Sequence, residues 1–297
     1  MSTKTTLRSV LDAHDYVVVP GVGTPLEARV VSETSFGCLY LSGYATAAAI
    51  HGVPDIGLIA RAEMVENLRR VVNATDLPVI VDADTGYGDV AGVAATVREM
   101  EAIGAAGIQI EDQIWPKRCG HLSGKEVVEA DVMIRKISAA VEARRSEDTL
   151  LIARTDALAP LGLREAIRRG QSYASAGADL IFVDAPASLS DLEAIGQEIS
   201  EVPLIVNVSE GGRTPALSAK EYSAMGYKVI LFPSTGIRVA AAAWRAFFAS
   251  LSTVEDSRKV PTPFLSFDDF NHLLGYTTVQ DFEQRILSSN QGGKGSV

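Results

Sequence analysis

The chain alternates short apolar runs with longer amphipathic segments from end to end, and this alternation limits the folds it can adopt. Eight runs rich in Val, Ile and Leu lack a regular apolar–polar alternation, which is typical of parallel strands buried on both faces. These runs are Tyr16–Pro20, Cys38–Ser42, Val79–Asp84, Ile108–Asp112, Leu150–Asp156, Leu180–Asp184, Leu204–Val208 and Val229–Phe232. Intervening segments have apolar residues at helical spacing, most clearly in Val90–Ile103, Asp131–Arg144, Leu163–Ala176 and Ile237–Phe248.

Strands that alternate with helices form a parallel sheet with right-handed crossovers. Eight such units predict an α/β fold that closes into a (β/α)8 TIM barrel, with an open, doubly wound sheet as the alternative. The chain has 297 residues, enough for one barrel of about 250 residues and an extension. We therefore predict a catalytic barrel over residues 1–252.

Residues 253–297 break the alternation and form a predicted C-terminal helical extension. Val260–Pro263 is a stiff connector with two prolines, and Phe267–Ser288 has the spacing of one or two amphipathic helices. The Gly- and Ser-rich segment Ser289–Val297 is expected to be disordered. The helices of this extension either cap their own barrel or exchange with a neighbouring subunit.

Composition argues against several classes of partner. The net charge is −10, whereas nucleic-acid binding needs clustered Lys and Arg. No run approaches the roughly 18 apolar residues of a membrane span, so no membrane partner is expected. Two cysteines, Cys38 and Cys119, are too few for a disulfide framework and favour a reducing compartment. Met1–Val10 lacks the apolar core of a secretory signal, so we expect a cytoplasmic location.

Polar and ionisable residues gather at the C-terminal ends of the predicted strands. In barrels of this type the active site is built at that end from the loops that follow the strands. The strand starts carry packing and turn residues instead. The polar end residues are Ser42, Asp82, Asp84, Glu111, Asp112, Arg154, Asp156, Asp184, Asn207, Glu210 and Ser234.

The carboxylates among these residues predict a metal site. Asp82 and Asp84 are two positions apart and would point to the same side of a strand, and Glu111 can join them from the next strand. Clustered carboxylates repel one another unless a cation lies between them. Oxygen ligands suit Mg2+ or Mn2+, with water or substrate completing the coordination. A structural network with Arg or Lys is the alternative. The histidines lack zinc-motif spacing, so zinc is not expected.

Cys119 is the candidate reactive residue. It lies beside Lys117, Arg118 and His121, cations and a proton carrier of the kind that lower a thiol pKa. The thiol could act as nucleophile or general acid, and Gly120 and Gly124 would let the loop close over a substrate. A loop thiol exposed to solvent is the alternative. Cys38, inside an apolar run, is interpreted as a core residue.

Arg154 ends an apolar run, where an unpaired charge would be costly. Its guanidinium suits a bidentate contact with a substrate carboxylate, and pairing with Asp156 or Glu111 is the structural alternative. Asn207 can add a polar contact. A thiol, cations and carboxylates at one end of a barrel favour a metal-assisted carbon–carbon lyase over a binding module.

Segments along most of the chain, from about Val18 to Phe248, together resemble the isocitrate lyase / phosphoenolpyruvate mutase superfamily. The segments are Tyr40–Gly43, Gly52–Gly57, Asp82–Gly88, Ile110–Gln113, Lys117–His121, Ile152–Asp156 and Glu210–Pro215. The resemblance implies a (β/α)8 barrel, Mg2+ as cofactor and a small anionic substrate that is a 2-oxo or 2-hydroxy acid. It also implies a homotetramer that exchanges a C-terminal helix.

The same resemblance assigns site residues. In the lyase branch the cysteine of the motif is the catalytic acid, which corresponds to Cys119. The implied catalytic set is Cys119, Lys117, His121 and Arg154. The implied metal-side carboxylates, some of which hold the ion through water, are Asp55, Asp82, Asp84 and Glu111. The implied substrate contacts are Tyr40, Ser42, Gly43, Gly120, Arg154 and Asn207.

The short chain is similar to the methylisocitrate lyase, dimethylmalate lyase and oxaloacetate hydrolase branches. We expect Mg2+-dependent cleavage of a 2-hydroxy dicarboxylate or tricarboxylate to a 2-oxo acid and a carboxylate by retro-aldol chemistry. An oxaloacetate hydrolase, a phosphonomutase of the carboxyphosphonoenolpyruvate type and a non-catalytic barrel are the alternatives. Two departures bear on the substrate. Gly21–Pro25 replaces a turn that often contains Asp, and Asp184 replaces a usual Glu.

Overall fold

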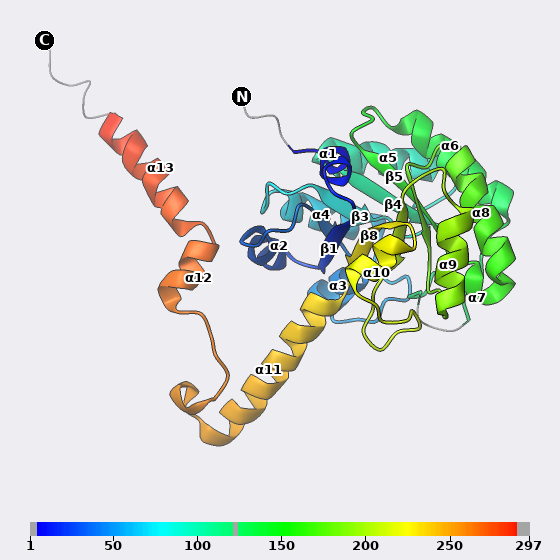
Figure 1. Ribbon diagram of the computed structural model, residues 1–297. Coiled ribbons are helices and arrows are strands. Elements are labelled where there is room, and N and C mark those ends of the chain that lie inside the picture. The colour runs from blue at the N-terminus through cyan, green and yellow to red at the C-terminus, as the bar shows by residue number, and fades with distance from the viewer. Residues whose placement is uncertain (1–4, 121–123, 290–297) are drawn as a thin grey trace, which may run out of the picture. The chain divides into compact units, whose positions relative to one another are not determined.

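The computed structural model describes residues 5–120 and 124–289. Eight parallel strands close into a barrel in sequence order (Figure 1). The predicted TIM barrel is confirmed, and the open sheet is wrong because β1 pairs with β8. The strands are β1 (Val17–Val22), β2 (Leu39–Leu41), β3 (Val79–Asp82), β4 (Gly107–Glu111), β5 (Leu150–Thr155), β6 (Leu180–Val183), β7 (Leu204–Asn207) and β8 (Tyr227–Phe232).

Helices surround the barrel, and all of them except α1 follow a strand. They are α1 (Leu7–Asp12), α2 (Pro25–Ser32), α3 (Gly43–Thr46), the π-helix η1 (Ala47–His51), α4 (Arg61–Val72), α5 (Val90–Ile103), α6 (Ala130–Ala143), α7 (Leu158–Leu161), α8 (Leu163–Ser175), α9 (Leu189–Glu198) and α10 (Ala219–Ala224). Helix α5 begins and ends at its predicted residues, and Gly104, with φ of 111°, ends it in the left-handed conformation that glycine adopts without strain.

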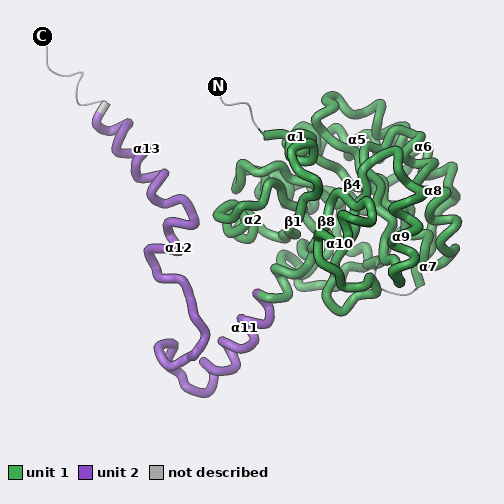
Figure 2. Tube along the Cα trace, viewed as in Figure 1, with its two compact units in different colours: residues 1–239 green, residues 240–297 purple. Residues whose placement is uncertain are grey.

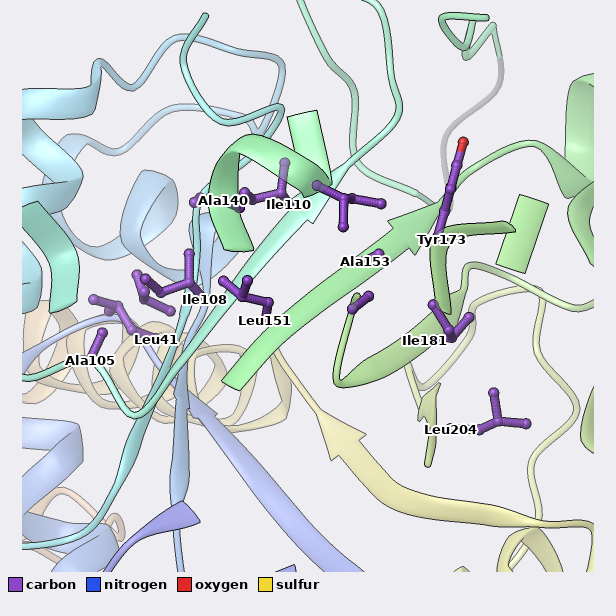
Figure 3. Packing of buried hydrophobic residues seen from close by; sticks show 14 of the residues in the cluster. Leu41, Ala105, Ile108, Ile110, Ala140, Leu151, Ala153, Tyr173, Ile181 and Leu204 are labelled. Carbon is purple, nitrogen blue, oxygen red and sulfur yellow. The ribbon is translucent and has the colours of Figure 1, made fainter. Parts of the chain in front are cut away.

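The apolar runs are continuous because both faces of each strand are buried. Leu39 and Leu41 of β2 belong to the cluster that packs against the helices, whereas Tyr40 between them belongs to a second cluster. Figure 3 shows part of the first cluster, including Leu41. The second cluster also contains Leu7 of α1. A Cβ on Gly107, the first residue of β4, would lie 3.0 Å from the Leu7 side chain, so α1 covers the barrel at its amino-terminal end.

The chain divides into two compact units, residues 1–239 and 240–297 (Figure 2). The division falls inside α11 (Thr235–Val254), and the boundary predicted after residue 252 lies further along the same helix. The later unit continues with the 3-10 helix η2 (Ser257–Lys259), α12 (Phe267–Leu273) and α13 (Tyr276–Ser289), so Phe267–Ser288 forms two helices. The segment predicted to be disordered is Ser289–Val297; Ser289 is instead the last residue of α13, and residues 290–297 lie outside the described part. Within the described residues, no helix is both long and apolar enough to cross a membrane.

Candidate active site

The carboxyl ends of the strands surround a cavity of about 290 Å³. Eight residues predicted for the site line it: Tyr40, Ser42, Asp55, Asp82, Cys119, Gly120, Arg154 and Asn207. Four others are buried and contact a lining residue, namely Gly43, Asp84, Glu111 and Lys117. His121 lies outside the described residues. The barrel thus brings together residues that are far apart in sequence.

Lys117 is clamped between two carboxylates. Its Nζ lies 2.6 Å from Oδ1 of Asp55 and 2.7 Å from Oδ1 of Asp84, and its side chain is buried. Burial raises the pKa of Asp84 to about 6, because the effect of desolvation and of the nearby Asp82 exceeds the opposing effect of Lys117. Burial alone would lower the pKa of Lys117, but Asp84 and Asp55 outweigh it and raise that pKa well above its ordinary value. Lys117 therefore stays charged and balances part of this acidic group.

Asp82 ends β3 and faces the cavity. Its Oδ2 accepts a hydrogen bond from the Gly43 backbone N–H at 3.3 Å, and its Oδ1 accepts one from the Asp84 N–H at 3.1 Å. The loop that follows β3 bends sharply here, with Asp84 at φ of 47°. A non-glycine residue at such an angle is strained, and the two hydrogen bonds hold the carboxylate in place.

Glu111 lies beside Arg154, with 3.3 Å between Oε2 and Nε. Its Oε1 is buried and has no hydrogen-bond partner in the described part of the chain. Burial raises the pKa of Glu111 well above its ordinary value despite Arg154. A buried carboxylate oxygen without a donor is costly, so this side of the site favours an additional cation or donor.

The described residues contain no group of three or more Asp, Glu, His or Cys side chains placed to hold a metal by themselves. The donors that do face this region are carboxylate oxygens, and Lys117 already contacts two of the four predicted carboxylates. Such a set suits Mg2+, which keeps several waters and binds through one or two carboxylates and substrate oxygens. It does not suit an ion that needs a closed protein cage.

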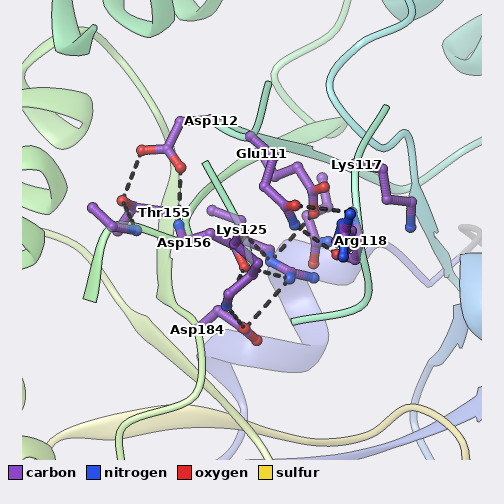
Figure 4. Close-up of polar contacts among 12 residues, drawn as sticks. Glu111, Asp112, Lys117, Arg118, Lys125, Thr155, Asp156 and Asp184 are labelled. Carbon is purple, nitrogen blue, oxygen red and sulfur yellow. Dashed lines mark hydrogen bonds and ion pairs between the residues drawn. The ribbon is translucent and has the colours of Figure 1, made fainter. Parts of the chain in front are cut away.

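Arg154 is held by a second buried cluster, of which Figure 4 labels Lys125, Asp156 and Asp184. Its Nε and Nη2 each donate to the Asp156 carboxylate at 2.8 Å, and Nη2 lies 3.4 Å from Oδ2 of Asp184. Lys125 joins the cluster, with its Nζ 2.7 Å from Asp156 and 3.0 Å from Asp184. The two roles predicted for Arg154 are contact with a substrate carboxylate and pairing with a carboxylate of the protein. The structure is compatible with both, because Arg154 is paired with carboxylates and also lines the cavity.

Sequence reasoning missed Lys125. Its partners follow β5 and β6, so no sequence spacing near residue 125 indicates them.

Asp112 is predicted as a polar residue at the end of a strand, yet it does not line the cavity. Its carboxylate accepts hydrogen bonds on the helix side of the barrel: from Thr155 Oγ1 at 2.7 Å, from the Asp156 N–H at 2.8 Å, from Tyr173 Oη at 2.8 Å and from Arg169 Nη1 at 3.0 Å. Side chains alternate along a strand, so Glu111 and Asp112 point in opposite directions.

Cys119 is partly exposed and lines the cavity. Its backbone N–H donates to the Asp55 carbonyl at 3.1 Å, and the preceding Arg118 exchanges two hydrogen bonds with the Gln113 side chain at 2.8 and 2.9 Å. Gly120 passes so close to Asp184 that a Cβ would overlap the carboxylate. Glycine is therefore required for the loop to approach Arg154. The other thiol, Cys38, is fully buried in the core as predicted.

The fold and the site together define a TIM-barrel protein with a carboxylate, an arginine and a thiol around one cavity at the carboxyl ends of its strands. The family model described as phosphoenolpyruvate phosphomutase matches residues 7–252. The chain belongs to this family, within the phosphoenolpyruvate mutase/isocitrate lyase superfamily.

Relatives cover nearly the whole chain. The chain is 38% identical to the 2,3-dimethylmalate lyase of Eubacterium barkeri over 288 residues, which covers 97% of this chain and 99% of that protein. It is 39% identical over 279 residues to the 2-methylisocitrate lyase of Aeropyrum pernix, covering 94% and 88%. The predictions of the superfamily and of a carbon–carbon lyase are confirmed by these relatives.

Solved structures of enzymes that catalyse other reactions have the same fold as this chain. Oxaloacetate acetylhydrolase in complex with 3,3-difluorooxalacetate has a TM-score of 0.89 and 34% identity, covering 99% of this chain and 98% of that one. Phosphonopyruvate hydrolase in complex with oxalate and Mg2+ has a TM-score of 0.86 and 30% identity, covering 95% and 98%. The fold therefore supports more than one reaction on small organic acids.

Proposed function

We propose that the protein is a Mg2+-dependent lyase that cleaves a 2-hydroxy dicarboxylate or tricarboxylate, of the dimethylmalate or 2-methylisocitrate type, into a 2-oxo acid and a carboxylate. The observation that carries the proposal is the placement of Cys119, Arg154 and Asp82 around one cavity of about 290 Å³. A carboxylate contact, a metal-side oxygen and a proton donor are the groups that this reaction needs.

Asp82 and Glu111, with Asp55 and Asp84 through water, would hold the metal. When bound, Mg2+ would favour ionisation of the substrate hydroxyl and stabilise the oxygen of the forming 2-oxo acid. Arg154 binds a substrate carboxylate, with Ser42, Gly43, Tyr40, Gly120 and Asn207 around the substrate. Lys117 keeps Asp55 and Asp84 in place by neutralising them.

In the reaction, the hydroxyl proton passes to a base and the C–O bond becomes a carbonyl. The bond between C2 and C3 breaks, and its electron pair stays on C3, where the adjacent carboxylate delocalises it. Arg154 stabilises the resulting negative charge. The Cys119 thiol then donates its proton to C3, which completes the departing carboxylate and leaves a thiolate. The proton that the base took from the substrate hydroxyl returns to this thiolate by exchange with solvent, so the thiol is restored before the next cycle.

The test is an assay of 2-oxo acid release with Mg2+ and a panel of 2-methylisocitrate, isocitrate, 2,3-dimethylmalate and oxaloacetate. Pyruvate or glyoxylate as product would support the lyase and identify its substrate branch. Oxalate and acetate would instead support the second candidate, an oxaloacetate hydrolase, which the likeness to oxaloacetate acetylhydrolase favours. Absence of all products would reject both and direct the search to phosphonate substrates.

We also propose that the protein is a homotetramer in which the C-terminal helices pack on another subunit. In residues 240–289 many large apolar side chains are exposed, including Trp244 at 54%, Phe248 at 61% and Phe267 at 84%. Exposed apolar area of this kind marks a protein interface. Light scattering should give four times the subunit mass of 31.5 kDa, and a monomer would contradict the proposal.

A further inference from the structure

Cys119 lies on a segment that leaves the end of β4 and later returns to it. The Gln113 backbone forms an antiparallel bridge with Val127, and the Ile114 N–H donates to the Glu126 carbonyl at 2.8 Å. These contacts fix the two ends of the segment against each other. The position of Cys119 between them therefore depends on what else holds the chain there.

The peptide unit that joins Arg118 to Cys119 is held from two sides. The Gln113 side chain donates from Nε2 to the Arg118 carbonyl at 2.8 Å, and the Cys119 N–H of the same peptide unit donates to the Asp55 carbonyl at 3.1 Å. Gln113 also accepts the Arg118 N–H through Oε1 at 2.9 Å. A carboxamide has both a donor and an acceptor to offer a peptide group, so Gln113 fixes the backbone on both sides of the Arg118 Cα.

The anchor is buried and the residue that it holds is not. Gln113 is 2% exposed, whereas Arg118 is exposed. If Gln113 offered no partner, the Arg118 N–H and carbonyl could turn outward and bond to water in exchange. Cys119 is partly exposed and lines the cavity, so a turn of the preceding peptide would carry its thiol away from the cavity.

The ion pairs of Lys117 do not replace this anchor. Its Nζ is held by Asp55 and Asp84, but a flexible four-carbon stem separates that contact from the backbone. The ion pairs keep the segment near the carboxylates without fixing the direction of the peptide that follows. The hydrogen bond from the Cys119 N–H to Asp55 is a single contact, about which the peptide can still rotate.

We propose that Gln113 is a positioning residue for Cys119: its side-chain amide fixes the Arg118 backbone and so holds the thiol at the cavity, in place to transfer a proton. The proton transfer rests on the proposed function, whereas the effect of Gln113 on the position of Cys119 does not. Gln113 itself stays outside the cavity lining and acts through the backbone.

The test compares the wild type with Gln113→Met, which keeps the length of the side chain and removes both hydrogen bonds. Gln171→Met is the matched control, because Gln171 donates from Nε2 to the Glu198 carbonyl at 2.7 Å and does not line the cavity. Each protein is crystallised and its thermal unfolding is recorded. The rate at which iodoacetamide alkylates Cys119 in the native protein is measured, with the modified cysteine identified by mass spectrometry. KM and kcat are determined on the substrate that the panel identifies.

In Gln113→Met we expect the Arg118 peptide to turn toward solvent and Cys119 to be alkylated about threefold faster or more, because the reaction needs access to the thiolate. The kcat should fall about 10- to 100-fold, since a misplacement of about 1 Å can cost about 10²-fold in rate. KM should stay within about threefold of the wild type, because Arg154 and Asp82 keep their own hydrogen-bond partners.

The control separates positioning from a loss of stability. A merely structural defect would lower the melting temperature without raising the alkylation rate of Cys119. Gln171→Met should show this behaviour, with the alkylation rate, KM and kcat of the wild type.

An unmoved Arg118 peptide in Gln113→Met, or a wild-type alkylation rate, would overturn the inference. If the wild type acts on no substrate in the panel, the proposed function fails, and the crystal structures and alkylation rates still decide whether Gln113 positions Cys119. If Gln113→Met does not fold, Gln113→Asn replaces it, because this shorter amide cannot keep both contacts with Arg118. Faster alkylation in folded Gln113→Asn supports the inference, and an unfolded protein or a wild-type rate refutes it.

Discussion

Lys117 and Asp84 form a buried ion pair, with 2.7 Å between Nζ and Oδ1, although they lie on loops that follow different strands. Asp84 follows β3 and Lys117 follows β4, and the two side chains are 3% and 4% exposed. The pair joins the loop that carries Cys119 to the carboxylates at the end of β3. It therefore ties the proposed proton donor to the proposed metal side of the cavity.

Replacing Lys117 by Met should strongly destabilise the protein. The change leaves Asp55 and Asp84 buried without their cation, and breaking a buried pair by removing one partner costs about 3–5 kcal/mol. Urea unfolding would measure the loss. Lys220, which is exposed, serves as the control, because Lys220→Met should change the free energy of unfolding by less than about 0.5 kcal/mol. Equal effects of the two changes would contradict the role of the pair.

Replacing Cys119 by Ser should remove turnover and leave Mg2+ binding intact. A serine hydroxyl is a much weaker acid than a thiol, and loss of a general acid costs about 10²- to 10⁴-fold in rate. Steady-state assays and calorimetric titration with Mg2+ would measure the two properties. Cys38→Ala is the matched control, since Cys38 is buried and does not itself line the cavity, and it should keep its turnover. Near wild-type turnover in Cys119→Ser would exclude Cys119 as the acid.

The two thiols should react at very different rates in the native protein. Burial raises the pKa of Cys38 to about 12, so this thiol stays protonated at pH 8 and is inaccessible. Cys119 is partly exposed and only thiolate reacts. A disulfide reagent should therefore modify one thiol per chain in the native state and two after denaturation. Rapid modification of both thiols in the native protein would show that the core around Cys38 opens.

Glu165 should contribute to stability above mildly acidic pH. Hydrogen bonds from Arg168, and less strongly from Arg169, lower its pKa to about 2 in spite of partial burial, whereas an unperturbed glutamate has a pKa near 4.3. A lowered pKa in the folded state stabilises the protein above about pH 4.3 and loses that effect as the pH falls to about 2.

Glu165→Gln should therefore lower the melting temperature clearly at pH 7 and much less at pH 2, where about half of the Glu165 side chains are already neutral in the folded protein. Melting temperatures of the two proteins between pH 7 and pH 2 would check this. A constant difference across this range would show that packing of Glu165, and not its charge, is responsible.

The closed barrel could be predicted from the local pattern of apolar residues along the sequence. Each strand is buried on both faces, as the separate clusters of Leu41 and Tyr40 show. Because both faces are buried, the residues of a strand form a continuous apolar run that is visible in the sequence. The end of such a run also marks where a polar side chain meets the cavity, so Asp82, Arg154 and Asn207 could be located from sequence.

The pairing of charges was decided only by the tertiary structure. Lys125 meets Asp156 and Asp184 across 31 and 59 residues of sequence, and Asp112 turns to α8 while Glu111 turns inward. An ion pair depends on distance in space, which closure of the barrel sets and no spacing along the chain encodes. Sequence therefore determined the barrel and the kinds of residue at its mouth, and folding determined which of these residues neutralise one another and which face the cavity.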